Sequence, residues 1–577
     1  MTANRADSES ELLLTVLSTL LREDVVGLRS RAAPRTEPDG LWLRLPAGDD
    51  AWLLPVRRAA PAFQYGTEAR LPLLRRESDG RELTTADAVL AALGDLADPA
   101  DRTGFDAFAA ECREARTALG LHRATRHEIA AHLADRYGAD PADWTGPDAA
   151  LAFDTLAARL DHPVYPTSRS RPGLTEAALR ACAPEFHPRL RLRWLLLPED
   201  AVTAHAWDPV PLPARPDPDG ERFALPVHPL TAGEPLRQAL RATGLDRRAE
   251  LVAHPGPEAV PTLSMRTVAL TADPRTHLKL PLATATLGRL NRRTIRPGTL
   301  TDGMAGQRLI EQVIAHEPRF RETVLHTDET RFAHAGHELL AVLVRRLPPG
   351  LEHTAVVPLA ALLAPAPGGR PLIDHLADRF HGGDPLALFD AFLTLLFDWQ
   401  TTLFGYGIAL ESHQQNISLL LDRPDGRTRL RLLLKDNDGP RVNTARLTDA
   451  LGTSASADAF DDRRTRQEGD GPVLDLFTTV TLHLCAGAYA FGLARHGHAP
   501  LDRLLALVHD RLAEAAGRLD PRRAALLHTH VLGAPRLPIK AMVTAGTLLA
   551  KERSGASDIN KHYTTGPNYL AQGRASR

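Results

Sequence analysis

The spacing of apolar residues divides the chain into helical and extended stretches. Residues 85–160 are rich in alanine and carry apolar side chains at helical spacing, which predicts a run of helices. Residues 41–56 alternate between apolar and polar positions and predict a hairpin that turns at residues 48–50. A further strand is expected at residues 190–197. Because both patterns occur along the chain, we expect a mixed α/β fold.

Irregular segments rich in proline, glycine or charge separate the patterned stretches. These predicted loops are residues 161–174, 208–220, 365–371 and 461–472. The first and third loops are candidate domain boundaries. They divide the chain into three parts: 1–160, 161–375 and 376–577.

The middle part contains a hairpin that gathers polar and cationic side chains. Residues 261–270 and 276–287 flank a proline-containing turn, and their alternation predicts an antiparallel pair. Pairing across the turn places Lys279 opposite either Thr267 or Arg266, because a one-residue change of register decides between them. In both registers these three residues lie on one ribbon with Ser264, and together they suit a polyphosphate ligand.

The last part contains a long apolar helix followed by a second hairpin. Apolar residues recur at helical spacing over 388–403, and the helix is expected to end at Gly405 or Gly407. Strands are predicted at residues 417–422 and at about 427–434.

The open end of this second hairpin brings two oxygen-bearing side chains together. Asn416 precedes the first strand and Asp436 follows the second, so we expect them to be neighbours and to suit Mg²⁺. Protein kinases hold their metal ions with the same order of helix, loop, hairpin and acid. Kinases place an aspartate base in the loop, whereas this loop offers Glu411 and His413. That difference argues against simple transfer of a γ-phosphoryl group to a hydroxyl.

Composition excludes some classes of protein. With 69 basic and 71 acidic residues the net charge is −2, which argues against a nucleic-acid binder that depends on overall positive charge. The three cysteines, Cys112, Cys182 and Cys485, form no close pair, which argues against a disulfide framework and fits a reducing compartment. Since no secretory signal and no apolar run of about 18 residues is visible, we expect a cytoplasmic protein without a spanning helix.

Seven short motifs occur in the order in which a known family carries them. They are residues 162–173 (HPVYPTSRSRPG), 184–186 (PEF), 226–230 (PVHPL), 264–267 (SMRT), 277–280 (HLKL), 411–416 (ESHQQN) and 435–439 (KDNDG). This ordered set resembles the NRPS-independent siderophore (NIS) synthetases of the IucA/IucC type, from about residue 160 onward. The chain departs from the family pattern at Tyr165, Arg169, Leu230 and Lys435, which bears on the substrate more than on the nucleotide chemistry.

The resemblance implies a three-lobed architecture and a set of site residues. The lobes are a thumb (1–160), fingers with the phosphate-binding hairpin (161–375) and a palm with the kinase-like helix, loop and hairpin (376–577). The implied ATP contacts are His162, Ser264, Arg266, Thr267, Lys279 and Arg293, with Arg289 as the alternative to Arg293. The implied Mg²⁺ ligands are Asn416 and Asp436, with Glu411 as a helper and Asp438 as the alternative to Asp436. The implied substrate contacts are His413, Lys435 and Lys540, and the implied catalytic residues are His413, Lys279 and Arg266.

The activity implied by the resemblance is that of an ATP-dependent ligase in siderophore biosynthesis. It adenylates a citrate-like or succinyl/hydroxamate-type carboxylate and condenses it with an amine, hydroxylamine or alcohol, releasing AMP and pyrophosphate. A kinase-like phosphotransferase and a non-catalytic nucleotide-binding protein are the alternatives. Small-molecule substrates are the expected partners, with neither nucleic acid nor membrane, and the resemblance also suggests a homodimer.

Overall fold

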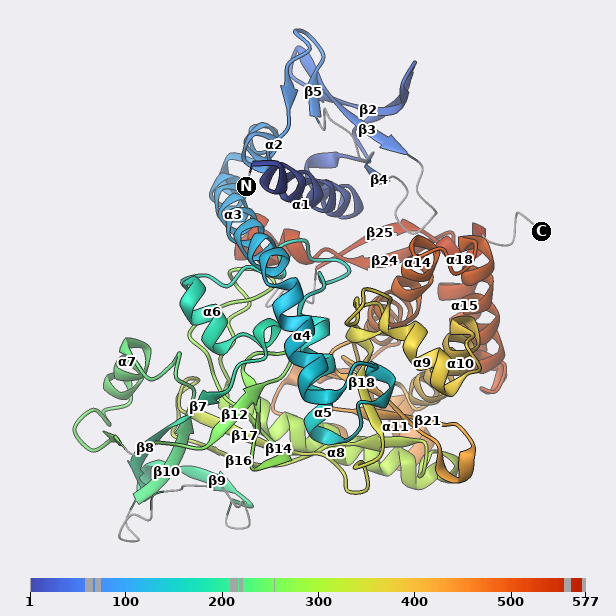
Figure 1. Cartoon of the computed structure of the whole chain (residues 1–577). Helices are drawn as coiled ribbons and strands as arrows, with labels where there is room; N and C mark the ends of the chain where they lie inside the picture. The colour runs from blue at the N-terminus through green and yellow to red at the C-terminus, as the bar shows by residue number, and fades with distance from the viewer. Residues whose placement is uncertain are drawn as a thin grey trace.

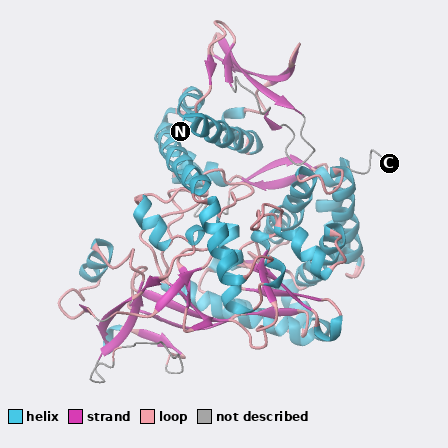
Figure 2. Ribbon diagram, viewed as in Figure 1, coloured by secondary structure: helices cyan, strands magenta, loops and turns pink. Residues whose placement is uncertain are grey.

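The computed structural model describes residues 2–57, 66–67, 74–207, 216, 222–253, 255–453, 455–554 and 562–572. Most of the loop predicted at 208–220 lies outside these residues, as does part of the tail that follows Lys551. The fold is mixed α/β, as the sequence predicts, with helices and several separate sheets distributed over an elongated molecule (Figures 1 and 2).

The N-terminal part is a small sheet packed beside helices. Its strands are β1 (Ala33–Glu37), β2 (Gly40–Ala47), β3 (Asp50–Arg57), β4 (Gly66–Thr67), β5 (Leu74–Arg76) and β6 (Glu82–Leu83). Its helices are α1 (Thr2–Arg22), α2 (Ala86–Gly94), α3 (Arg102–Ala124), α4 (Arg126–Tyr137) and α5 (Gly146–Ala158). The predicted hairpin is confirmed, since Ala47 pairs with Asp50 across the turn between β2 and β3. The predicted run of helices is confirmed as α2 to α5.

The middle part is built on a seven-stranded sheet in the order β7-β12-β13-β14-β17-β16-β9. These strands are β7 (Leu190–Arg191), β9 (Thr203–His205), β12 (Glu258–Pro261), β13 (Thr267–Leu270), β14 (Asp273–Lys279), β16 (Asp328–His334) and β17 (Ala341–Arg346). A three-stranded sheet lies beside it, formed by β8 (Arg193–Pro198), β10 (Arg222–Val227) and β11 (Glu250–Leu251). The helices of this part are α6 (Glu176–Cys182), α7 (Glu234–Ala242) and α8 (Pro297–His316).

Three of the predicted strands are wrong in part. The stretch at 276–287 is a strand only as far as Lys279, where β14 ends, and it continues as an irregular segment. The stretch at 190–197 forms two strands of different sheets, because the chain leaves β7 at Leu192, which exchanges backbone hydrogen bonds with Pro257 and Gly256. Residues 262–266 form a tight turn rather than the start of a strand, with the Ser264 hydroxyl accepting the N–H of Thr267 at 3.1 Å. Alternating polarity does not separate such a turn from a strand.

The C-terminal part surrounds a four-stranded sheet in the order β15-β21-β20-β18, formed by β15 (Val324–His326), β18 (Ala355–Pro358), β20 (Ile417–Asp422) and β21 (Arg429–Leu434). The predicted second hairpin is confirmed as β20 and β21, and the preceding helix α10 (Pro385–Gly405) ends at one of the two expected glycines. Short strands complete this part: β19 (Ile408–Ala409), β22 (Arg441–Asn443), β23 (Arg466–Gln467), β24 (Arg536–Lys540) and β25 (Tyr563–Pro567). The other helices are α9 (Leu372–Phe380), α11 (Thr444–Leu451), α12 (Ala455–Asp458), α13 (Gly471–Leu476), α14 (Ala488–Arg495), α15 (Leu501–Ala516), α16 (Pro521–Leu527), α17 (Lys551–Ser554) and α18 (Tyr569–Gln572).

One continuous helix in the described part of the chain has the length and apolar composition of a membrane span. It runs over Gly471–Arg495 and consists of α13, a π-helical segment (Phe477–Gly487) and α14. Of its most apolar 18-residue window, 83% is buried inside the protein. Its apolar character is therefore explained by packing in the core.

Helix α8 packs closely against the loop that follows β21. A Cβ atom added at Gly306 would lie 1.9 Å from the carbonyl oxygen of Asn437, whereas one added at Gly303 would meet only side-chain carbons at 3.9 Å or more. The absence of a side chain at Gly306 thus allows the helix to hold this loop in place.

We expect Gly306→Ala to destabilise the protein by roughly 1–3 kcal/mol, because the new methyl group forces the helix and the loop apart. Gly303→Ala is the matched control, and the higher helix propensity of alanine makes it neutral or stabilising by up to about 1 kcal/mol. Urea unfolding of both variants measures the difference in the free energy of unfolding. Equal midpoints for the two variants would show that the close approach at Gly306 is not a constraint.

Candidate functional site

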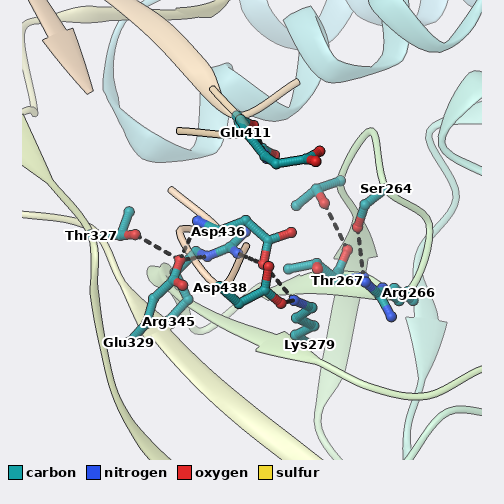
Figure 3. A network of polar contacts seen from close by, with 12 residues as sticks. Ser264, Arg266, Thr267, Lys279, Thr327, Glu329, Arg345, Glu411, Asp436 and Asp438 are labelled. Atoms are coloured by element: carbon teal, nitrogen blue, oxygen red, sulfur yellow. Dashed lines mark hydrogen bonds and ion pairs between the residues drawn. The ribbon is translucent and has the colours of Figure 1, made fainter. Parts of the chain in front are cut away.

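The candidate site lies where three strands of the seven-stranded sheet meet the loop after β21 (Figure 3). Strand β14 contributes Lys279, and its neighbour β17 contributes Arg345, which pairs with His277 two residues before the lysine. Strand β16 contributes Glu329, whose carboxylate accepts the Arg345 Nε hydrogen at 2.5 Å. Because alternate residues of a strand share one face, Lys279 and Arg345 project to the same side of the sheet.

The loop at 435–439 presents two carboxylates to these cations. Lys279 Nζ donates a hydrogen bond to Asp436 and lies 3.5 Å from Asp438 Oδ2, while Arg345 Nη2 lies 3.3 Å from Asp436 Oδ1. Asp436 has a left-handed backbone conformation, with φ at 62°, and its N–H donates to Glu329 Oε1 at 2.9 Å. The contacts with Lys279 and Arg345 fix the side chain of Asp436, and the hydrogen bond to Glu329 fixes its backbone.

Burial and neighbouring charges give the two carboxylates different pKa values. Burial alone raises the pKa of Asp436, but the charges of Lys279, Arg345 and Arg266 outweigh it and hold the pKa well below its usual range. Burial raises the pKa of Asp438, and the charge of Asp436 adds to this effect. Asp436 is thus ionised at neutral pH, and the two carboxylates differ in pKa because the cations act most strongly on Asp436.

The turn between β12 and β13 presents the predicted Ser264 and Arg266, and the predicted Thr267 is the first residue of β13. The register is now settled, because Thr267 pairs directly with Lys279. Arg266 Nη1 donates to the Thr294 carbonyl at 2.7 Å, and its charge acts on Asp436 and Asp438. The hairpin therefore brings together the cations and hydroxyls that the sequence predicts to be neighbours.

The two candidate arginines of the following loop have different surroundings. Arg293 exchanges backbone hydrogen bonds with Leu282 and Thr284 at 2.9 Å. Burial, together with the nearby Arg266, lowers the pKa of Arg293 to about 9, so the guanidinium stays charged at neutral pH. Arg289 is exposed. Burial beside Arg266 favours Arg293 as the member of this cationic cluster.

The loop before β20 brings a third group of predicted residues to the site. Glu411 lies 3.6 Å from Lys540 Nζ, an ion pair that connects this loop to β24. Burial, with the nearby charges of Lys540 and Arg293, lowers the pKa of His413, and Glu411 opposes this effect. Burial and the neighbouring His413 lower the pKa of His162 to about 3. Both imidazoles are therefore neutral at physiological pH.

The structure brings the two ends of the second hairpin together, as predicted. The Asn416 carbonyl accepts the N–H of Lys435 at 3.0 Å, which places Asn416 beside the loop that carries Asp436. The Asn416 amide donates to the Glu411 carbonyl at 3.0 Å. Within the described ranges, no group of three or more His, Cys, Asp or Glu side chains is arranged to hold a metal ion.

Lys435 is buried, and both Asp154 of helix α5 and Asp436 lie close enough for their charges to act on it. Burial lowers its pKa, and Asp154 of α5 is the neighbouring charge that opposes this effect most strongly. Asp154 is itself buried, with a raised pKa. The two opposite charges therefore act on each other across the boundary between the loop at 435–439 and the N-terminal part of the chain.

Sequence reasoning missed Glu329 and Arg345, which hold Asp436 in place. Arg345 follows the apolar residues 341–344 on β17. Its side chain is only 5% exposed, and that of Glu329 is 4% exposed. An arginine inside a short apolar strand is the signal that identifies such a residue, since a buried guanidinium requires a partner.

Another missed residue, Glu111 of α3, joins distant segments at the edge of the site. Its carboxylate accepts hydrogen bonds from Tyr165, Thr167 and Thr547 and from the backbone N–H of Arg289 at 3.2 Å. Nothing in the helical pattern of residues 102–124 distinguishes this glutamate from its exposed neighbours.

Comparison with known proteins relates this fold to siderophore synthetases. The structure matches that of ATP-bound aerobactin synthetase IucA from a hypervirulent pathotype of Klebsiella pneumoniae with a TM-score of 0.72 and 19% identity, over 98% of this chain and 99% of the other. Among curated sequences, an uncharacterized protein, y4xN, of Sinorhizobium fredii is 28% identical over 50% of this chain and 51% of its own length. Staphyloferrin B synthase of Staphylococcus aureus is 27% identical over 32% of this chain and 33% of its own length. The chain thus spans about half or less of the length of these curated relatives.

Two family models match successive parts of the chain. Residues 150–364 match the IucA / IucC family, and residues 387–555 match a family described as ferric iron reductase FhuF-like transporter. The match at residues 150–364 is to the IucA/IucC family, and the structural match to aerobactin synthetase IucA shows that the chain shares its fold. The resemblance inferred from the seven motifs is confirmed.

Asp302 on α8 provides a test of the packing behind the site. Its side chain is 2% exposed and accepts the backbone N–H of Asp461 at 2.5 Å. Burial raises the pKa of Asp302 to about 6, and the charges of Asp461 and Asp438 contribute to the increase. A carboxyl whose pKa is raised in the folded state stabilises the fold fully below its unfolded pKa near 3.8, and this contribution is lost as the pH rises to about 6.

We expect Asp302→Asn to remove this pH dependence, because the amide keeps an acceptor for Asp461 and does not titrate. Between pH 4 and 6 the wild-type protein should lose about 1.4 kcal/mol per pH unit relative to the variant. Urea unfolding at pH 4.5, 5.5 and 7 measures the difference in the free energy of unfolding. If the free energies of unfolding of the wild type and of Asp302→Asn change with pH by the same amount over this range, the raised pKa of Asp302 is contradicted.

Proposed function

We propose that the protein is an ATP- and Mg²⁺-dependent ligase of siderophore biosynthesis. It converts a carboxylate into an acyl adenylate with release of pyrophosphate, and it then transfers the acyl group to an amine, a hydroxylamine or an alcohol with release of AMP. The observation that carries this proposal is a cluster of three buried cations beside two carboxylates. The cations are Lys279, Arg266 and Arg293, and the carboxylates are Asp436 and Asp438. The ATP-bound state of the aerobactin synthetase IucA structure supports the choice of nucleotide.

The cationic cluster fits the phosphates of a nucleotide. Arg266 Nε and Arg293 Nε are buried and have no hydrogen-bond partner among the described residues. A buried guanidinium hydrogen without an acceptor is costly, and phosphate oxygens are strong acceptors for it. Negative charge accumulates on the leaving pyrophosphate, so fixed cations here stabilise the transition state more than the ground state.

The oxygen ligands fit Mg²⁺ in a site completed by phosphate. Asp436 and Asp438 are the candidate carboxylate ligands, and Asn416 and Glu411 are the remaining oxygen donors of the two loops. Mg²⁺ commonly uses one or two protein carboxylates and takes its other ligands from phosphate and water. When bound, the ion supplies additional charge neutralisation at the phosphates.

The neighbouring loop fits the acyl substrate and its acceptor. His413 is neutral, so its imidazole can accept a proton from an attacking amine while Lys540 provides a positive charge for a substrate carboxylate. Lys435 is assigned here to the support of the loop through Asp154. The proximity of Lys540 to Glu411 and the effect of both charges on His413 support acyl chemistry at this loop.

A kinase-like phosphotransferase is the second candidate. The order of helix α10, loop, hairpin and Asp436 supports it, because protein kinases use the same order. The loop at 411–416 contains no aspartate to serve as the base for a hydroxyl substrate. The two activities differ in their nucleotide product, since the ligase forms AMP and the phosphotransferase forms ADP.

We expect the protein, incubated with ATP, Mg²⁺, hydroxylamine and a panel of di- and tricarboxylates, to form AMP and pyrophosphate with at least one carboxylate. Chromatography of the nucleotides and mass spectrometry of the hydroxamate measure the products. Formation of ADP without AMP would favour the phosphotransferase, and the absence of any turnover would favour a non-catalytic binding protein.

Two arginine variants tie this activity to the site. Arg293→Ala removes a buried cation, and the loss of one charge-assisted phosphate contact of roughly 1.5–3 kcal/mol predicts a fall in kcat/KM of about tenfold to a hundredfold. Arg289→Ala is the matched control at an exposed position and should stay within about threefold of the wild type. A larger fall in kcat/KM for Arg289→Ala than for Arg293→Ala would show that Arg289, and not Arg293, contacts the phosphates.

A further inference from the structure

A cavity lies outside the candidate site, where strand β14 begins and strand β17 ends. Its volume is about 610 Å³. The charged and imidazole residues that line it are Arg275, Arg321, His326, Asp328 and Arg346, and the apolar ones are Ile314, Val324, Leu325, Leu347, Pro348 and Pro349. None of the residues assigned to nucleotide, metal or substrate lines this cavity.

The balance of charge in this cavity is positive. Its one carboxylate, Asp328, is paired with Arg331, which lies outside the lining, and also accepts hydrogen bonds from Thr330. The lining therefore contains three arginines, Arg275, Arg321 and Arg346, and no other carboxylate that balances their charge.

These arginines have few partners within the described structure. Arg346 Nη2 lies 3.9 Å from Asp273, a distance beyond hydrogen bonding, and Arg275 has one long hydrogen bond, to the Leu347 carbonyl at 3.4 Å. Arg275 Nε is buried and has no acceptor, and Arg321 is exposed without an ion pair among the described residues. Guanidinium groups in this state recognise carboxylate or phosphate groups.

The elements that form this cavity also build the candidate site. Arg346 lines the cavity, while Arg345, the preceding residue of β17, binds Glu329 and Asp436. Similarly, Asp328 precedes Glu329 on β16. Strand β15, which contributes His326 to the cavity wall, pairs in parallel with β21 up to Leu434, the residue before the loop at 435–439.

We propose that this cavity is a second binding site for a small anion that carries two or more carboxylate or phosphate groups. Arg275, Arg321 and Arg346 bind its anionic groups, and the wall of Leu325, Leu347 and Pro348 contacts its carbon skeleton. The cavity is of the size that accommodates small-molecule ligands. The site is separate from the proposed nucleotide site, because Arg275 lies four residues from Lys279, about 13 Å along an extended strand.

The test is a calorimetric titration of the full-length protein with inorganic pyrophosphate and, separately, with tricarballylate. The Arg321→Gln/Arg346→Gln double variant should lose at least tenfold in affinity for one or both anions, because two charge-assisted contacts are removed. Arg427→Gln, a change at an exposed arginine outside the cavity, is the control and should bind as the wild type does. The pyrophosphate and tricarballylate arms distinguish a phosphate ligand from a polycarboxylate ligand.

The Arg293→Ala variant separates this proposal from the proposed function. Binding that depends on Arg321 and Arg346 should persist in Arg293→Ala, even if the nucleotide chemistry is absent from the wild type. Identical titrations for the wild type and the double variant, both folded by their thermal unfolding midpoints, would overturn the proposal. Loss of all anion binding in Arg293→Ala would also overturn it, since the binding would then belong to the cationic cluster around Lys279.

Discussion

The buried ion pair of Lys279 with Asp436 and Asp438 is the interaction on which the rest of the site depends. It joins a strand of the seven-stranded sheet to the loop of a different sheet, and the Lys279 side chain is only 6% exposed. Breaking a buried pair by removing one partner typically costs about 3–5 kcal/mol, because the remaining charge is left unpaired. Glu329 and Arg345 also contact Asp436, so this carboxylate is held in position before any ligand binds.

Left-handed backbone conformations occur in three of the loops that carry candidate residues. Outside glycine, eight described residues have such a conformation, and three of them, Met265 (φ 63°), Leu287 (φ 56°) and Asp436 (φ 62°), lie in these loops. Such conformations persist only where the surrounding structure over-determines them. Here the surroundings are the turn closed by Ser264 and the hydrogen bond from Asp436 to Glu329. The strain is consistent with loops that are preorganised for a charged ligand.

Much of the site could be predicted because its residues lie on two hairpins whose patterns are local. The pairing of Thr267 with Lys279 and the approach of Asn416 to the loop of Asp436 both follow from hairpin geometry. Contacts between the two hairpins could not be derived in this way, since they depend on how separate sheets pack. Arg345 was missed for this reason: it reaches the site from a strand that is more than 60 residues away in sequence from β14 and 90 from Asp436.

Affinity for MgATP in the Lys279→Met variant tests the central claim most directly. The account predicts that Lys279→Met weakens MgATP binding at least tenfold by isothermal titration calorimetry, whereas Lys435→Met, at the buried lysine near Asp154, weakens it much less. Circular dichroism of both variants controls for folding. Equal MgATP affinity in the wild type and in a folded Lys279→Met variant would contradict a nucleotide site built on this ion pair.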